Sequence, residues 1–327
     1  MKRKIFVCFI ICAALLCGSA LADSLAVGGT PLGISMRIEG VAVAGFSEIK
    51  TEGGTRSPAE EAGIEAGDII VKLGSKDIAT AKDFTDAVGQ LDGKEISVTV
   101  SRGEKLRQFS LTPAKDADGI WKLGVWLRDG ISGVGTLTFY EPESGLYGAL
   151  GHSISDSDTG RVLPLHDGSI CRAEIVDVVP GKAGEPGELC GCSDEARVLG
   201  DIQINCVCGI FGTADLPAGD VLETGDMTEG KALIRCTLDG SGVQEYEIEI
   251  QKVEHCDGCT TAVIHITDPA LLEKTGGIVQ GMSGSPIIQN GQLVGAVTHV
   301  FVNDPTSGYG ISIYDMIDAA QTVENAA

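Results

Sequence analysis

The segment "QGMSGSPIIQNGQLVGAV", residues 280–297, decides the fold of the C-terminal part of this chain. Ser283 stands between Gly281 and Gly284, which relieve steric limits on the backbone and permit a sharp turn. The dipeptide Asn290-Gly291 predicts a tight hairpin turn between "PIIQ" and "QLVGAV". A serine on a tight loop that a rigid hairpin holds is typical of a nucleophile, and a polar loop before a hairpin is the plainer alternative.

The same loop offers backbone donors for a developing negative charge. The N–H groups of Gly281 and Ser283 are two residues apart, so a tight turn can aim both at one point, as an oxyanion hole requires. The order of glycine, serine, proline, strand, turn and strand looks like the nucleophile loop of chymotrypsin-like peptidases. Under that match Ser283 is the nucleophile, and Ser285 occupies the place of a glycine.

A nucleophilic serine needs a base, and the chain has five histidines. His152, in "YGALGHSISDSDTG", has small neighbours at a strand-to-turn transition, which suits a presented imidazole. His299 follows Ser283 by sixteen residues and is the rival base. Of the remaining three, His166 fits a polar turn, His255 lies beside a cysteine pair, and His265 fits a strand.

The third member of a triad holds the imidazole tautomer and stabilises the imidazolium. Asp268 ends a β-like run fifteen residues before Ser283. With His152 it gives the His–Asp–Ser chain order of the chymotrypsin architecture. Asp156 and Asp158 lie close to His152 in sequence and remain alternatives.

Length and composition favour two β-rich domains. The chain has 327 residues, 43% of them hydrophobic, and its 45 glycines indicate many tight turns. After the polar segment "AKDADG" (114–119), short β-like runs follow one another closely. We therefore expect a mainly β chain whose residues 120–327 form two small barrels.

Residues 27–113 form a separate pattern of strands and two short helices. The segment "TAKDFTDAVGQL" has helical spacing with Thr80 as its N-cap. The run "SPAEEAGIEAGDIIVKLGSKDI" (57–78) resembles that of a PDZ domain. That resemblance implies that the loop around Leu32, Gly33 and Ile34 binds a peptide carboxylate while the peptide adds as a strand. An intramolecular clamp on the neighbouring domain is the alternative use of such a fold.

The N-terminus predicts export. Residues 1–22 have a basic start, an apolar run and a small-residue cleavage signal, and an uncleaved membrane anchor is the alternative. Without these residues the chain has 21 Lys and Arg against 46 Asp and Glu. So acidic a protein would be repelled by nucleic acids and by anionic lipid head groups.

Eight cysteines follow residue 170, an even number that favours disulfides in an exported chain. Two C-x-C pairs and the run "HCDGC" leave zinc ligation as the alternative. The spacing matches no standard zinc motif, so we expect neither a metal nor another cofactor.

Three longer runs resemble the stage IV sporulation protein B family: "KLGVWLRDGISGVGTLTFYEPESG", "GLYGALGHSISDSDTG" and "ITDPALLEKTGGIVQGMSGSPIIQNGQLVGAVTHVFVNDPTSGYGI". The order of export signal, PDZ and serine peptidase matches as well. The resemblance implies that His152, Asp268 and Ser283 form the triad. The cysteine-rich segment "ELCGCSDEARVLGDIQINCVCGIFG" departs from the family's pattern.

The resemblance also implies a role in endospore formation. Members of the family are exported into the space between the forespore and mother-cell membranes. They cleave themselves near the N-terminus, and they cleave a regulatory membrane protein that restrains an intramembrane protease, which releases the processing of a late sigma factor. Two other functions remain open. One is a PDZ-based binding protein with a degenerate peptidase domain, and the other is an envelope quality-control peptidase.

Overall fold

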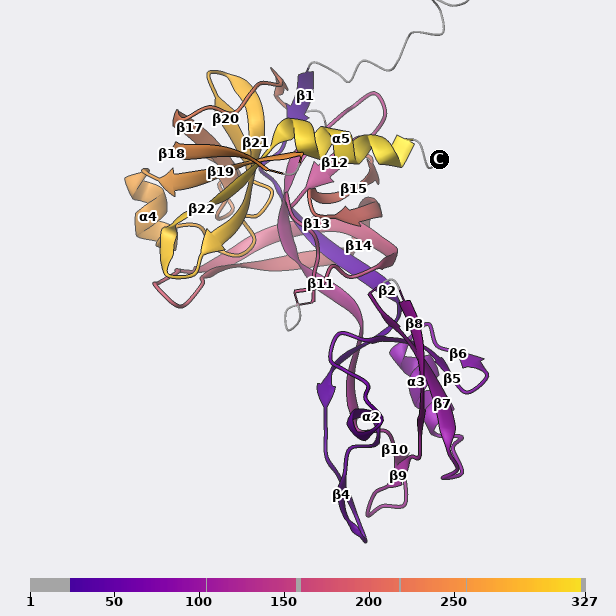
Figure 1. Cartoon of the computed structure of the whole chain (residues 1–327). Helices are drawn as coiled ribbons and strands as arrows, with labels where there is room; N and C mark the ends of the chain where they lie inside the picture. Colours follow the sequence, from indigo (N-terminus) through magenta and orange to yellow (C-terminus); the bar gives the residue numbers. More distant parts are fainter. Residues whose placement is uncertain (1–23, 104, 157–159, 218, 257, 325–327) are drawn as a thin grey trace, which may run out of the picture.

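The computed structural model describes residues 24–103, 105–156, 160–217, 219–256 and 258–324. The predicted export signal, residues 1–22, lies outside the described residues. Within them, no helix is long and apolar enough to cross a membrane. The chain is mainly β, as the sequence predicts (Figure 1).

The first barrel is a ring of strands closed by backbone pairing. β2 (Pro31–Phe46) pairs with β13 (Leu165–Val179), which is followed around the ring by β14 (Glu188–Cys206) and β15 (Gly209–Ala214). β15 pairs with β12 (Leu146–Ala149), β12 with β11 (Val125–Tyr140), and β11 returns to β2. The strand β1 (Ser24–Val27) joins this sheet between β11 and β16 (Val221–Glu223).

The second barrel is closed as well. Its six strands are, in spatial order, β17 (Gly230–Thr237), β18 (Val243–Cys256), β19 (Cys259–Ile266), β22 (Asp304–Ser312), β21 (Gln292–Phe301) and β20 (Pro286–Gln289). Its interior is apolar, with Ile234, Ile264 and Val297 among the fully buried side chains. The helix α4 (Pro269–Thr275) connects β19 to the serine-containing loop, and α5 (Ile313–Glu324) lies against the first barrel beside β12 and β15 (Figure 1). Both expected barrels are therefore present.

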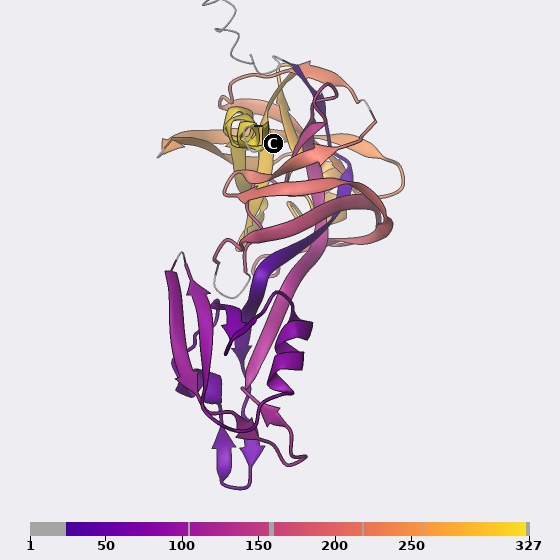
Figure 2. The ribbon, with the colours of Figure 1, turned by 90° about the vertical axis from the view of Figure 1, so that its right-hand side faces the viewer.

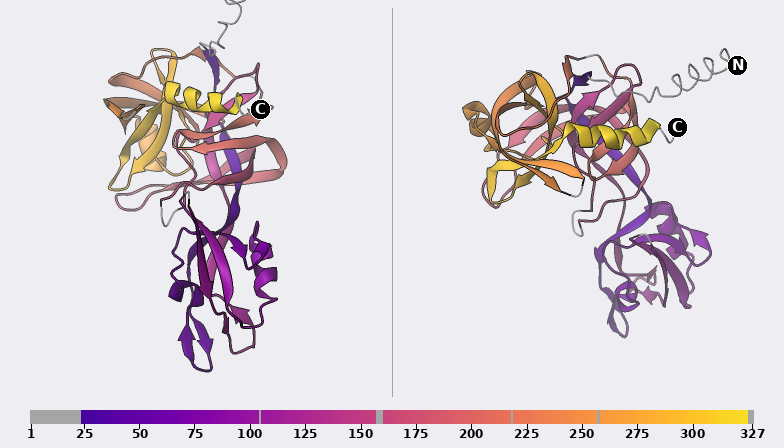
Figure 3. Two further views of the ribbon diagram at one scale, coloured as in Figure 1. Left: turned by 45° about the vertical axis from the view of Figure 1, so that its right-hand side comes forward. Right: turned by 45° about the horizontal axis from the view of Figure 1, so that its top comes forward.

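A smaller unit, residues 41–128, is inserted between the two long strands of the first barrel. β2 and β11 run out of the barrel and pair again in this inserted unit, where β5 (Ile69–Leu73), β7 (Ile96–Arg102) and β8 (Lys105–Leu111) extend their sheet (Figures 2 and 3). The other elements of the unit are short: β3 (Ile49–Thr51), β4 (Gly54–Arg56), α2 (Pro58–Glu61), β6 (Lys76–Asp77), α3 (Ala81–Val88), β9 (Ala114–Lys115) and β10 (Trp121–Lys122).

Local signals in the inserted unit are confirmed. The Thr80 side chain accepts a hydrogen bond from the Asp83 N–H, and the Asp83 carboxylate accepts one from the Thr80 N–H, which forms a capping box at the start of α3. Phe84, Ala87 and Val88 are the buried face of that helix.

The domain boundaries differ from those expected. Residues 31–38 of β2 pair with β13 and β11 inside the first barrel, so this segment belongs to the barrel rather than to a unit that starts at residue 27. The polar segment 114–119 is part of a β9–β10 hairpin, not a linker. Residues 31–46 form one continuous strand, β2, which passes from the first barrel into the inserted unit. Gly40 has φ 99°, and a Cβ there would lie 2.7 Å from the Ile70 carbonyl oxygen, so close approach of β5 requires the glycine.

Candidate active site

The Ser283 loop lies between α4 and β20 and is tied to the first barrel. The Thr136 N–H donates to the Ser283 carbonyl at 3.0 Å, and the Thr136 hydroxyl donates to the Gly281 carbonyl at 2.7 Å. Gly284 has φ 92°, and a Cβ there would lie 2.1 Å from the Thr136 carbonyl oxygen. The sharp turn inferred from the glycines is present, and the Asn290-Gly291 turn behind it has positive φ at both residues, 53° and 79°.

The structure separates the two serines of the loop. Ser283 lines a pocket of about 660 Å³ between the barrels, and its hydroxyl donates a 2.6 Å hydrogen bond to the Thr298 carbonyl. Ser285 is fully buried, and its hydroxyl finds no partner among the described residues. Only Ser283 can meet a substrate that enters the pocket.

His152 projects into the same pocket from the turn that follows β12. Leu150 and Gly151 both adopt positive φ, 70° and 68°, which reverses the chain just before the imidazole. The His152 Nδ1 atom lies 2.8 Å from the Ser153 carbonyl oxygen. A carbonyl only accepts hydrogen bonds, so Nδ1 carries the proton of the neutral ring, and Nε2 is the free basic nitrogen. Burial lowers the pKa of His152, and the neighbouring His299 lowers it further.

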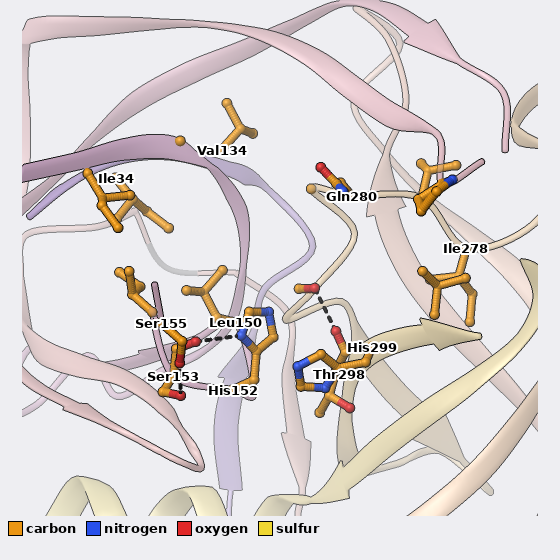
Figure 4. Close-up of a pocket in the computed structure, with 18 of the residues that line it drawn as sticks. Ile34, Val134, Leu150, His152, Ser153, Ser155, Ile278, Gln280, Thr298 and His299 are labelled. Carbon is orange, nitrogen blue, oxygen red and sulfur yellow. Dashed lines mark hydrogen bonds between the residues drawn. The ribbon is translucent and has the colours of Figure 1, made fainter. Parts of the chain in front are cut away.

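The rival base, His299, lies beside His152. The centroids of the two rings are 4.5 Å apart with their planes tilted by 37° (Figure 4). His299 is on β21, directly after the Thr298 carbonyl that holds Ser283. Burial lowers its pKa as well. Both candidate bases therefore reach the pocket, whereas His166, His255 and His265 do not line it.

Asp268 is placed elsewhere. It is the N-cap of α4, where one carboxylate oxygen accepts hydrogen bonds from the Ala270 N–H at 2.9 Å and the Leu271 N–H at 3.2 Å. The other oxygen accepts from the Glu247 N–H at 3.2 Å. The structure thus brings His152 and Ser283 to one pocket and does not bring Asp268 to it. A catalytic role for Asp268 stays a prediction.

Of the two alternative acids, Asp156 lines the pocket and Asp158 lies outside the described residues. The Asp156 side chain is 3% exposed, and one oxygen lies 3.7 Å from the Arg128 guanidinium. Asp156 therefore brings a carboxylate with a cationic neighbour to the pocket that holds His152.

The proposed oxyanion donors are free in the structure. Among the described residues, the N–H groups of Gly281 and Ser283 donate to no protein acceptor. The neighbouring N–H groups are engaged, since Met282 donates to Val279 and Gly284 to Val297. Two unengaged donors beside a pocket-lining hydroxyl are compatible with an oxyanion hole.

The expected carboxylate-binding loop is not a loop. Leu32, Gly33 and Ile34 lie within β2 and are paired on both sides, with Gly135 to Gly133 of β11 and with Arg172 to Ile170 of β13. Their place inside the first barrel leaves no free strand edge for a peptide, so this assignment was wrong. Ile34 instead lines the pocket that holds His152 and Ser283.

Sequence reasoning missed Asn205, which supports the His152 segment. Its side-chain oxygen accepts from the Ile154 N–H at 2.7 Å, and its amide nitrogen donates to the carbonyls of Ile154 and Leu163, each at 2.9 Å. These three bonds fix the chain two residues after His152. Nothing in the run "INC" marks this role, because the partners are more than forty residues away in sequence.

Comparison with known proteins adds two family matches. Residues 119–317 match the family described as SpoIVB peptidase S55, and residues 51–102 match a PDZ domain. The PDZ match lies within the inserted unit.

Two curated relatives match shorter segments. One is serine protease HTRA1 of Xenopus tropicalis, 37% identical over 57 residues, which are 17% of this chain and 12% of that protein. The other is zinc metalloprotease RasP of Oceanobacillus iheyensis, 30% identical over 99 residues, which are 30% of this chain and 22% of that protein. The chain thus spans less than a quarter of either relative. The crystal structure of Rv3671c protease from M. tuberculosis in its active form aligns with 59% of this chain and 74% of its own, at 15% identity and a TM-score of 0.33.

Proposed function

Because the chain belongs to the SpoIVB peptidase S55 family, we propose that it is a serine endopeptidase in which Ser283 is the nucleophile and His152 the base. The family match supports the peptidase class that the sequence predicts. The observation that carries the residue assignment is the shared pocket between the barrels, lined by the Ser283 hydroxyl and the His152 imidazole.

The chemistry follows from the tautomer of His152. With Nδ1–H held by the Ser153 carbonyl, Nε2 can take the proton of Ser283 as its oxygen attacks the scissile carbonyl, and can return it to the leaving amine. The Gly281 and Ser283 N–H groups then stabilise the oxyanion. In the structure the Ser283 proton points instead to the Thr298 carbonyl. Catalysis therefore requires a rotation of the Ser283 side chain from Thr298 towards His152.

Peptide capture by the inserted unit would use a different edge from the one expected. Residues Val125–Arg128 of β11 pair with β2 and with no other described strand. Beside them lies α3, whose Ala81 N–H donates to the Asp129 carboxylate at 2.8 Å. An extended peptide would add as a strand along this edge. The PDZ match makes proteins or peptides the partner class.

The finer biological role rests on the family resemblance. We propose that the protein is exported into the space between the forespore and mother-cell membranes and that it cleaves itself near the N-terminus. Its proposed substrate is a regulatory membrane protein of an intramembrane protease complex. The proposed role is therefore limited proteolysis during endospore formation. The supporting observations are the family match and the predicted export signal.

The test compares the full chain with its Ser283→Ala variant. The variant should retain the fold and lose both self-cleavage and labelling by a serine-directed fluorophosphonate, since loss of a triad serine costs about 10⁶ in kcat. Ser285→Ala is the matched control, because that hydroxyl is fully buried. Labelling that persists in Ser283→Ala would refute the assignment.

A second function is favoured by two observations at the pocket. The Ser283 hydroxyl is bound to a backbone carbonyl, and Asp268 is absent from the pocket, as in a degenerate peptidase domain that only binds peptides. A wild-type chain that takes no fluorophosphonate but still binds peptides through the inserted unit would establish this alternative.

A further inference from the structure

Two cysteines stand at the end of the hairpin that supports His152. Cys206 is the last residue of β14 and pairs with Gly209, the first residue of β15, so Val207 and Cys208 form a two-residue turn. Both thiols are half-buried, and neither forms a disulfide in the structure. They pack against the apolar cluster beneath α5, together with Cys259 of the second barrel.

The residues that flank the turn contact the segment that carries His152. Asn205, next to Cys206, makes the three hydrogen bonds that fix Ile154 and Leu163. On the other side, Gly209 has φ 140°, and a Cβ there would lie 2.6 Å from the Ala149 carbonyl oxygen and 3.3 Å from the Gly151 nitrogen. The two strand ends that hold the turn therefore contact the chain before and after His152.

We propose that Cys206 and Cys208 are a thiol–disulfide exchange site, and that closing their disulfide displaces the segment that carries His152. The cysteine pair is thus a redox-sensitive support of the pocket. The link to catalysis rests on the proposed function, whereas the exchange site itself does not.

The environment of the pair favours exchange. A hydrogen bond from the Cys208 thiol lowers the pKa of Cys206 to about 6. The backbone N–H groups of Cys208 and Gly209 lower the pKa further, while burial of the thiol opposes these effects. The same contact raises the pKa of Cys208. Because the thiolate is the nucleophile in exchange, Cys206 is the attacking group and Cys208 the resolving one.

The reaction needs a small or protein disulfide as its oxidant. The Cys206 thiolate attacks one sulfur of oxidised glutathione, which breaks the S–S bond and releases one glutathione thiolate. The Cys208 thiolate then attacks the Cys206 sulfur of the mixed disulfide and releases the second glutathione. The protein gives up two electrons and two protons, and oxidised glutathione is reduced to two thiols.

A second C-x-C pair in the same strand is a built-in control. Cys190 and Cys192 lie inside β14, where an extended backbone places alternate residues about 6.6 Å apart, near the upper limit for a disulfide. Burial, with Glu188 and Asp177 nearby, raises the pKa of Cys190. We expect this pair to remain reduced under conditions that oxidise the turn pair.

A metal is the competing use of these thiols. The Cys259 thiol contacts the Asp315 carboxylate at 3.5 Å. Both groups lie close enough to Cys208 to raise the pKa of its thiol. Within the described ranges, however, no group of three or more His, Cys, Asp and Glu residues has the geometry to hold a metal ion.

The experiment equilibrates the full chain in glutathione buffers of increasing oxidised fraction, followed by acid quenching, alkylation with iodoacetamide and tryptic mass mapping. The peptide 198–231 contains Cys206 and Cys208 and no other cysteine, and 183–197 contains Cys190 and Cys192. We expect 198–231 to lose two hydrogens and to resist alkylation, while 183–197 takes two alkyl groups. Three outcomes would overturn the exchange site: double alkylation of 198–231 in every buffer, a cross-link to the peptide that contains Cys259, or stoichiometric zinc that Cys206→Ser abolishes.

The coupling to His152 has its own readout. Oxidation should slow fluorophosphonate labelling of Ser283 by about tenfold or more, because a displacement of about 1 Å can cost up to ~10²-fold. Cys208→Ser should remove this sensitivity, and Cys192→Ser, an exposed cysteine of the same strand, should keep it. An unchanged labelling rate in the oxidised protein would refute the coupling. A chain that never takes the label would refute the proposed function, and the mass mapping would still decide the exchange site.

Discussion

Asp268 gives the sharpest test of the site, because its two possible roles predict effects of different size. As the cap of α4 it contributes to stability, and as a triad acid it contributes to catalysis. Asp268→Ala removes the cap, worth about 1 kcal/mol, and the bond from the Glu247 N–H, worth about 1 kcal/mol more. A loss of about 2 kcal/mol lowers the Tm of a domain of this size by about 4–8 °C.

Asp268→Ser separates the roles. Serine caps a helix about as well as aspartate, so this variant loses only the Glu247 bond and about 2–4 °C in Tm. Since the structure engages both carboxylate oxygens in backbone bonds outside the pocket, we expect Asp268→Ser to retain most of the wild-type kcat/KM. Loss of a triad aspartate costs about 10⁴-fold instead.

The assay pairs thermal unfolding with peptide cleavage at matched protein concentration. A fall of about 10⁴-fold in Asp268→Ser with a Tm close to wild type would refute the reasoning from the structure. It would establish the carboxylate as the third catalytic group, as the sequence predicts. If Asp268→Ser lowers the Tm by as much as Asp268→Ala does, then helix capping is not the contribution of Asp268 to stability.

Two further predictions concern the inserted unit and the pH dependence. The Asp68 side chain is fully buried against Arg102, at 2.6 and 2.7 Å, and Arg102 also pairs with Glu65 at 2.6 Å. Asp68→Ala removes the charge-assisted bonds to Asp68 and leaves the Glu65 pair, so it should lower the free energy of unfolding by about 1.5–3 kcal/mol in urea titrations; a loss below about 0.5 kcal/mol would contradict this. A base must be neutral, so kcat/KM should rise as pH rises through the lowered pKa of His152 and level off below the ordinary value of 6.5. His299→Ala removes a cationic neighbour and admits water, so the acid limb should move to higher pH; an inactive variant at every pH would make His299 the base.

Short-range features of the fold could be predicted from the sequence. The Asn290-Gly291 turn, the Thr80 cap and the glycine-flanked serine depend on backbone preferences of adjacent residues, and each is present. The barrels follow from closely spaced strands. Contacts between distant segments could not be predicted in the same way. The Asn205 bonds to Ile154 and Leu163, and the stacking of His152 on His299, depend on how two barrels close.

The error at Leu32–Ile34 has a particular physical cause. In sequence, "PLGISMRI" (31–38) and "GVAVAGF" (40–46) look like two strands of one small domain, with Glu39 between them. In the structure one strand passes through both units, and β11 does the same in the opposite direction. Ile34 of β2 and Val134 of β11 line the pocket, while the far halves of the same strands pair with each other in the inserted unit, where β2 also pairs with β5 of the segment that matches a PDZ domain. Two strands without an intervening loop leave little freedom for the inserted unit to move independently of the pocket wall. A peptide that pairs with β11 would therefore act mechanically on the two strands that carry Ile34 and Val134. A flexible linker at residues 114–119 would not transmit such an effect to the pocket.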